Sequence, residues 1–233
     1  SGQQPRIINA AVLTAQTAGL TVVGTLQKPY TARSLVELLE TRFSPFEDSQ
    51  RHGEEWVRKR LAEGSLADRT TAHFQPKHSL ATASLVGFEA LARPLDGSLV
   101  SPDLLFGELV PLDTSMAITR RVIQQSVAAA SRFAHQPMSV SFNCRAEVLC
   151  HPRFLPLLEE EVLAARIDRS FVTVELTEHP TLEGLQSLSR AASQLTMLGY
   201  RFAVDDFGKG SAGFEILTQL PFTELKIDKE FFW

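Results

Sequence analysis

The sequence predicts an α/β fold in which a (β/α) barrel follows a short, separate α/β segment. From residue 54 onward, short apolar runs typical of buried strands alternate with segments of helical period. Repeated βα units give a parallel sheet, either doubly wound or closed as a barrel. Oxygen-bearing side chains follow the apolar runs one after another, at the positions where a barrel carries its active site. These observations together favour the barrel.

Composition describes an ordinary globular protein without a membrane segment. The chain has 233 residues, of which 44% are hydrophobic and 21% charged, which is enough to bury a core. A formal charge of −4 argues against a nucleic-acid polymer as partner and leaves room for a small anion if a cation offsets the charge. No apolar run reaches the roughly 20 residues that cross a bilayer, and no signal peptide is evident. We therefore expect a cytoplasmic protein, with Cys144 and Cys150 as reduced thiols.

The first 45 residues predict a small α/β segment. A helical pattern over Ile7–Ala18 precedes the strand-like run Leu20–Leu26, then Lys28-Pro29, then a second helical pattern over Thr31–Arg42. This order resembles the last third of a response-regulator receiver domain, where the lysine senses a phosphorylated aspartate. The phosphoacceptor and the earlier strands are absent from this chain, so the segment could not itself receive a phosphoryl group. An arbitrary α/β fragment is the alternative.

A polar, turn-rich stretch, Phe43–Gln50, marks the expected boundary, with a linker over 46–53 and the main domain over 54–233. A charged helical pattern over Glu54–Gly64 opens that domain. The expected strands are Ala72–Pro76, Leu85–Ala92, Met138–Cys144, Phe171–Thr177, Arg201–Asp206 and Glu224–Asp228. The expected helices are Ser115–Ala134, Phe154–Ala165 and Leu182–Leu198, the last of them stopped by Gly199.

Polar side chains fall at the expected ends of consecutive strands. They are Glu89, Asn143, Glu175 with Glu178, Asp205 with Asp206, and Lys226 with Asp228. One carboxylate at a strand end is usually a helix cap or a surface charge. Carboxylate or amide oxygens at four successive strand ends are expected to converge on one rim of a barrel.

The ligands gathered there are all oxygens, and oxygen ligands select Mg²⁺, Mn²⁺ or Ca²⁺ over Zn²⁺. The adjacent carboxylates of Asp205 and Asp206 allow one to serve each of two metals, or one to bridge them. Two metals about 3.5–4 Å apart activate water and stabilise the leaving oxygen in phosphodiester hydrolysis. Lys226 would add positive charge near the water or the phosphate, although a solvated lysine is the plainer interpretation.

Six motifs in this order resemble the EAL domain family. They are HFQP from His73, GFEALARP containing Glu89, SVSFN ending at Asn143, VELTE containing Glu175, AVDDFGKG containing Asp205, and LKID containing Lys226. The resemblance covers about Glu54 to Trp233. It implies a TIM-like barrel that hydrolyses cyclic di-GMP to linear pGpG with Mg²⁺ or Mn²⁺, at a site that holds two metals. A receiver segment before such a domain is a common bacterial pairing.

The resemblance also implies a role for each matching residue. Glu89, Asn143, Glu175 and Asp205 would bind the first metal, with Asp205 shared, and Asp206 would bind the second. Lys226 would orient or activate the water, and Glu178 would anchor the loop after Asp206. The dinucleotide would be contacted by Gln75 and by Arg93 through its guanidinium, with Asp228 a further polar contributor. A homodimer and a receiver-domain or histidine-kinase signalling partner are compatible with the family.

Two departures from the family pattern keep an alternative open. The loop reads DFGKGSAGFE, with Lys209, Ser211 and Gly213 where the family has a different motif that couples metal binding to dimerisation. The chain also stops after the sixth expected strand, where the family continues with two more. The barrel is therefore expected to be incomplete, through truncation or degeneracy. The alternative function is an inactive or weakly active EAL module that binds cyclic di-GMP or a protein as a regulatory receptor.

Overall fold

The computed structural model describes residues 8, 12, 14, 15, 17, 22, 25, 26, 30–42, 45–133, 138–176, 184–207 and 218–227. The chain separates into two compact units, residues 1–52 and 53–233. The expected domain boundaries remain a prediction. Within the described residues, no helix combines the length and apolar character needed to cross a membrane.

In the first unit, the described residues between Ile8 and Thr17 are helical, while Val22, Thr25 and Leu26 lie outside any strand. The strand expected over Leu20–Leu26 is therefore not formed at its described positions. Lys28 and Pro29 lie outside the described residues.

Helix α2 spans Ala32–Arg42, one residue shorter than expected, because Thr31 caps it. The Thr31 hydroxyl accepts a hydrogen bond from the Ser34 amide at 3.1 Å, and the Ser34 hydroxyl accepts one from the Thr31 amide at 3.0 Å. These two bonds satisfy donors that a helix start leaves unpaired. The receiver-like identity of this segment remains a prediction.

Helix α3 spans Pro45–Ala62, which corrects the expectation that the stretch Phe43–Gln50 is rich in turns, at its described residues from Pro45 on. Proline is well tolerated in the first turn of a helix, where its missing N–H is not needed. The polar residues that suggested turns are compatible with an exposed helical surface. Towards its end the helix places Val57 in the core of the second unit and Trp56 against that core.

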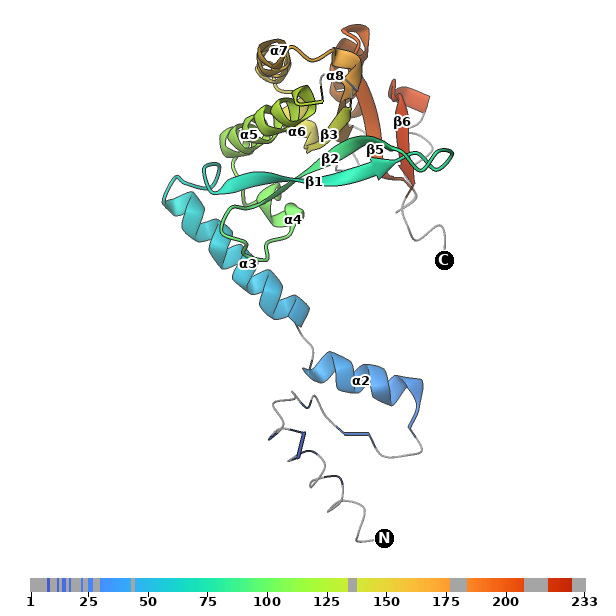
Figure 1. Cartoon of the computed structure of the whole chain (residues 1–233). Coiled ribbons are helices and arrows are strands. Elements are labelled where there is room, and N and C mark those ends of the chain that lie inside the picture. The colour runs from blue at the N-terminus through green and yellow to red at the C-terminus, as the bar shows by residue number, and fades with distance from the viewer. Residues whose placement is uncertain are drawn as a thin grey trace. The chain divides into compact units, whose positions relative to one another are not determined.

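The second unit is built on one six-stranded sheet whose strands are ordered β1-β2-β3-β4-β5-β6 (Figure 1). The strands are β1 (Thr70–His78), β2 (Leu85–Pro94), β3 (Ser139–Cys144), β4 (Val172–Leu176), β5 (Arg201–Phe207) and β6 (Glu224–Ile227). Strands β2 to β6 are parallel, as expected for βα units. Strand β1 pairs antiparallel with β2, which corrects the expectation of a wholly parallel sheet. Only six residues separate β1 from β2, too few for the crossover that parallel neighbours need.

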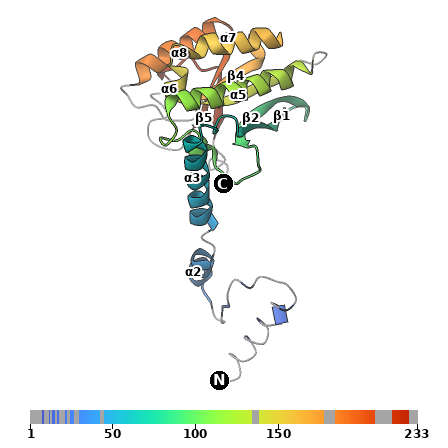
Figure 2. The ribbon, with the colours of Figure 1, turned by 90° about the vertical axis from the view of Figure 1, so that its left-hand side faces the viewer.

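Helices cover one face of this sheet. Helix α5 (Leu112–Ser131) packs on β1, β2 and β3, α7 (Phe154–Ala165) packs on α5, and α8 (Leu185–Met197) packs on β5 (Figure 2). The shorter helices are α4 (Pro102–Leu105), α6 (Ala146–Leu149) and the 3₁₀ helix η1 (Arg169–Phe171). The core lies between sheet and helices, where buried strand residues such as Phe142 and Phe202 are fully enclosed.

Helix ends follow local chemistry. Helix α7 has the expected bounds and buries Phe154, Leu158 and Val162, which recur every four residues. Helix α8 begins three residues later than expected, and Gly199 at φ +93° follows its end, as predicted. That left-handed conformation is the one glycine adopts without steric cost. Cys144 is buried and Cys150 half-buried, and no disulfide joins them.

Candidate metal centre

Three carboxylates from strands β2, β4 and β5 meet on the sheet face opposite α5 and α8. They belong to Glu89 of β2, Glu175 of β4 and Asp205 of β5. Side chains alternate between the two faces of a strand, and the following or preceding residues Ala90, Val174 and Val204 are buried. Each carboxylate offers one oxygen such that the three oxygens lie within 4.8 Å of one another. The expected convergence of Glu89, Glu175 and Asp205 is therefore found.

Glu89 does not lie at the end of its strand, as the sequence suggested, but in the middle of β2. Its Cα pairs in register with Ser141 of β3, whereas Asn143 pairs with Glu175 of β4. Glu89 therefore lies two residues before the level of Asn143 and Glu175 along the parallel strands. The long Glu89 side chain still reaches the same point as the others.

Asn143 lies beside the three carboxylates on β3. Its Nδ2 donates a hydrogen bond to Glu89 Oε1 at 3.1 Å. Its Oδ1 is buried and has no hydrogen-bond partner among the described residues. Leaving a buried acceptor unpaired costs about 1–3 kcal/mol. An unpaired oxygen next to three carboxylates is what a cation site with an amide ligand would contain.

Lys226 of β6 joins the three carboxylates. Its Nζ donates to Glu89 Oε2 at 3.1 Å, to Glu175 Oε2 at 2.8 Å and to Asp205 Oδ2 at 2.8 Å. An ammonium group has three N–H donors, so all of them are used here. Lys226 is therefore at the centre of the site, where the sequence had placed it only nearby.

A second lysine, Lys77 of β1, reaches the same site. Its Nζ lies 3.0 Å from Glu175 Oε1 and donates to Ser141 Oγ at 2.6 Å. Sequence reasoning missed Lys77 and Ser141. The signal was present, because Lys77 follows Gln75 by two residues and alternation puts both on one face of the strand. The antiparallel course of β1 brings Lys77 level with Gly87 rather than with the ends of the parallel strands.

The electrostatics of the cluster differ between its two glutamates. Burial raises the pKa of Glu89 above its usual value and the charge of Glu175 raises it further, with Lys226 and Asn143 opposing. Burial also acts to raise the pKa of Glu175, but the charges of Lys77 and Lys226 outweigh it and leave that pKa lowered. Of the two glutamates, Glu175 is therefore the more firmly ionised and Glu89 the more easily protonated.

The cluster opens into a cavity of about 470 Å³. Its lining residues are Glu89, Leu91, Ala92, Pro102, Asp103, Phe106, Gly107, Glu108, Asn143 and Asp205. Four of these carry carboxylates, and none carries a positive charge. An anionic ligand would be repelled from this cavity unless a cation bound first. The segment after β2, which includes α4, was not expected from the sequence to contribute to the site.

Two other predicted residues share the strands of the site. Gln75 of β1 is the cross-strand partner of Glu89 and is exposed. Arg93 lies on the same face of β2 as Glu89, four residues on, and its Nη1 donates to the Ala92 carbonyl at 2.8 Å. Asp206 belongs to β5, but its side chain lies outside what the structure describes. Glu178, Asp228 and the loop residues Lys209, Ser211 and Gly213 also lie outside the described residues.

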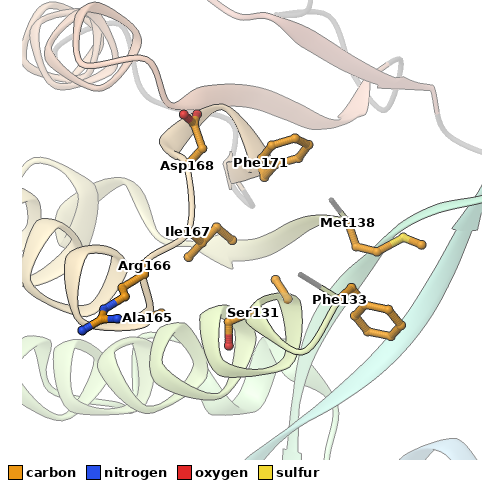
Figure 3. Close-up of a pocket in the computed structure, with 9 residues that line it drawn as sticks. Ser131, Phe133, Met138, Ala165, Arg166, Ile167, Asp168 and Phe171 are labelled. Carbon is orange, nitrogen blue, oxygen red and sulfur yellow. The ribbon is translucent and has the colours of Figure 1, made fainter. Parts of the chain in front are cut away.

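A second cavity of about 470 Å³ lies at the amino ends of β3 and β4, away from the carboxylates (Figure 3). Figure 3 shows Phe133, Met138, Ile167 and Phe171 among its lining, with Arg166 and Asp168 at its edges. This lining is mainly apolar and holds no cluster of ligating groups. The cation chemistry of the described residues belongs to the carboxylate cluster.

The fold and the cluster define a class of protein: an α/β domain with a candidate cation site, made of oxygen ligands, on one face of its sheet. The family model of the EAL domain matches residues 58–232. The chain therefore belongs to the EAL domain family.

Individual relatives agree with this assignment. The signalling protein YkoW of Bacillus subtilis is 31% identical over 73% of this chain and 22% of its own length. The cyclic di-GMP phosphodiesterase RocR of Pseudomonas aeruginosa is 25% identical over 97% of this chain and 60% of its own. Thus the chain spans only part of each relative. The EAL enzyme Bd1971, solved with cAMP and cyclic di-GMP bound, superposes with a TM-score of 0.66 at 24% identity, covering 90% of this chain and 59% of that one. That similarity supports the fold.

Proposed function

We propose that this protein hydrolyses cyclic di-GMP to linear pGpG in bacterial signalling, using Mg²⁺ or Mn²⁺. The observation that carries the proposal is the unpaired, buried Asn143 Oδ1 beside three converging carboxylates. This donor set consists of oxygens only, which fits Mg²⁺ or Mn²⁺ and does not suit Zn²⁺. RocR, an EAL relative, is a cyclic di-GMP phosphodiesterase.

The residues fit a metal in the following way. Glu89, Asn143, Glu175 and Asp205 would hold the first ion, with Asp205 shared, and Asp206 would hold a second. Such ions supply Lewis acidity that lowers the pKa of bound water and stabilises developing charge on oxygen. The carboxylate-rich cavity lining explains why the dinucleotide, itself an anion, would depend on them.

The remaining roles belong to the chain's own side chains. Lys226 would orient or activate the attacking water, or hold a phosphate oxygen, once its ammonium no longer donates to all three carboxylates. In hydrolysis the water oxygen bonds to phosphorus, the bond from phosphorus to the 3′ oxygen breaks, and that oxygen leaves as a hydroxyl. Gln75 and Arg93 would contact the dinucleotide, Glu178 would support the loop after Asp206, and Asp228 would be a further polar contact.

The cellular setting belongs to the same proposal. We place the protein in the bacterial cytoplasm, with a receiver-like amino-terminal segment, a homodimeric state and a receiver or histidine-kinase partner upstream. A regulatory receptor that binds cyclic di-GMP without cleaving it is the alternative, since Lys209, Ser211 and Gly213 depart from the loop that links metal binding to dimerisation in the family.

The deciding experiment incubates the purified protein with cyclic di-GMP and Mg²⁺ or Mn²⁺ and measures pGpG by chromatography. Formation of pGpG that EDTA abolishes would support the enzyme. Binding of cyclic di-GMP with no pGpG, even at high protein concentration, would replace the enzyme by the receptor. Glu55→Gln, an exposed change on α3 outside the site, serves as the control for variants of the cluster.

A further inference from the structure

Lys226 holds a position that a metal ion would also need. Its Nζ contacts one oxygen from each of Glu89, Glu175 and Asp205, and these are the three groups whose oxygens converge. A divalent cation binds such oxygens at about 2.1 Å, nearer than the 2.8–3.1 Å of the ammonium contacts. The ammonium and the metal would therefore compete for the same position, where their positive charges would repel each other strongly. The ammonium and a metal cannot occupy the point between the carboxylates together.

Lys77 is placed differently. It contacts Glu175 through Oε1, the oxygen that Lys226 does not use, and it is tied to Ser141 Oγ at 2.6 Å. Glu175 is fully buried, and a buried carboxylate without a partner is strongly destabilising. Lys77 can keep Glu175 paired whether or not Lys226 remains in contact with Oε2.

The charges of the described side chains fit this division. Three carboxylates face two ammonium groups, which leaves the cluster with one excess negative charge without any metal. The metal-free site is therefore nearly compensated and can stay folded with its ligands already converged. Asn143 Oδ1 has no hydrogen-bond partner among the described residues, so neither lysine satisfies it.

We propose that the Lys226 ammonium acts as a built-in cation that fills the metal position in the metal-free protein. Metal binding is then an exchange: the incoming divalent ion displaces the ammonium, while Lys77 holds Glu175 throughout. The displaced ammonium becomes available to the water or the phosphate, so the same exchange prepares the site for hydrolysis. This inference rests on the proposed metal dependence and adds that the metal replaces the Lys226 ammonium.

The test measures Mn²⁺ binding by calorimetry in the absence of any nucleotide. Lys226→Met removes the competing cation, and we expect Mn²⁺ to bind at least about tenfold more tightly than to the wild type. Lys77→Met is the matched control, because it removes the same charge from the same carboxylate without freeing the metal position. Lys59→Met controls for charge at a distance, since Lys59 is exposed on α3. Tightening in Lys226→Met must exceed that in Lys77→Met. Equal effects, or no tightening, would overturn the exchange.

A second measurement needs no stable variant of the site. In wild-type protein carrying ¹⁵N-lysine, the hydrogen-bonded ammonium groups of Lys226 and Lys77 give NMR signals of their own. Titration with Mg²⁺ is expected to shift or remove the Lys226 signal and to leave that of Lys77 in place. A Lys226 signal unchanged at saturating Mg²⁺ would contradict the exchange. Failure to cleave cyclic di-GMP would remove the proposed function while leaving these two results standing.

Discussion

At the scale of single residues, the site depends on one fully buried carboxylate, that of Glu175. Lys77 contacts one of its oxygens at 3.0 Å and Lys226 the other at 2.8 Å. Both ammonium groups are partly exposed, whereas Glu175 is not, so the carboxylate depends on them for its charge compensation. A cluster of this kind is sensitive to loss of any one charge.

Glu175→Gln is expected to destabilise the metal-free protein by up to about 3–5 kcal/mol, because Lys77 loses its carboxylate partner and Lys226 loses one of its three. Urea unfolding in EDTA measures the change. The control is Glu54→Gln, which removes the same charge from an exposed pair with Arg58 and should cost less than about 1 kcal/mol. Equal effects of the two substitutions would show that burial of Glu175 does not matter.

Glu89→Gln is expected to reduce hydrolysis of cyclic di-GMP by at least about a hundredfold while the chain stays folded. The amide keeps the shape of the side chain but removes a negative metal ligand. The pGpG assay, together with circular dichroism, checks both parts. Turnover within a few-fold of the Glu55→Gln control would take Glu89 out of the metal centre.

Gly87 shows how closely β2 and β3 approach beneath the site. A Cβ at this position would lie 2.1 Å from Ser139 Oγ and 2.4 Å from the Ser139 carbonyl oxygen. Gly87→Ala should lower stability by about 1–3 kcal/mol, measured by thermal or urea unfolding. Adding Ser139→Ala should not restore it, because the carbonyl belongs to the backbone. Full rescue by the second substitution would mean that the side chain alone causes the conflict.

At the scale of elements, a polar link joins α7, η1 and the start of β5. Arg169 Nε and Nη2 contact the two oxygens of Glu159 at 2.8 and 2.6 Å, and the Tyr200 hydroxyl also donates to Glu159. The hydrogen bond from Arg169 lowers the pKa of Glu159 below 4.5, with Tyr200 adding to it and burial opposing. The link therefore stabilises the fold only while Glu159 is ionised.

This link predicts a pH dependence. Because the folded pKa of Glu159 is lowered, its contribution is present above pH 4.5 and is lost as pH falls through the lower folded value. Between about pH 5 and about pH 3, the wild type should lose more unfolding free energy than Glu159→Gln does. Urea unfolding across this range gives both slopes. Identical slopes would show that Glu159 does not contribute.

Prediction of elements from sequence succeeded where local signals were complete and failed where they depended on distant partners. Helix α7 has its expected bounds because the spacing of its buried apolar residues fits the period of a helix over its whole length. Strand β1 was expected, but its antiparallel direction was missed, since strand direction is not encoded in the alternation of side chains. Helix α3 was missed at its start because polar residues suit both turns and exposed helix surfaces.

At the scale of the whole molecule, the domain brings together side chains from all six strands of the sheet, and contacting residues such as Glu89 and Lys226 are 137 positions apart in the chain. No single strand supplies enough of these side chains to form the site alone. Four carboxylates line the cavity at this site, and an anionic ligand would be repelled from it without a bound cation. A cation that binds only the folded domain would also stabilise that domain.

Saturating Mn²⁺ is expected to stabilise the domain. At a free concentration of about a hundred times the Kd, binding to the folded state alone adds about 2.7 kcal/mol to the unfolding free energy. Thermal unfolding with Mn²⁺ and with EDTA measures the difference. Glu89→Gln should lose most of this gain, whereas Glu55→Gln should keep it. A gain that survives in Glu89→Gln would place the metal elsewhere.

The sequence by itself determined the family, the order of the six strands and of helices α5, α7 and α8, and the convergence of Glu89, Asn143, Glu175, Asp205 and Lys226, because these depend on motifs and on side-chain period. The cavity beside the carboxylates could not be predicted from the sequence. Only the tertiary structure showed that Lys226 contacts all three carboxylates, that Lys77 and Ser141 belong to the same cluster, and that Asn143 keeps an unpaired oxygen. The physical reason is that hydrogen bonds across strands depend on register and strand direction, which are fixed by packing and not by any local run of residues.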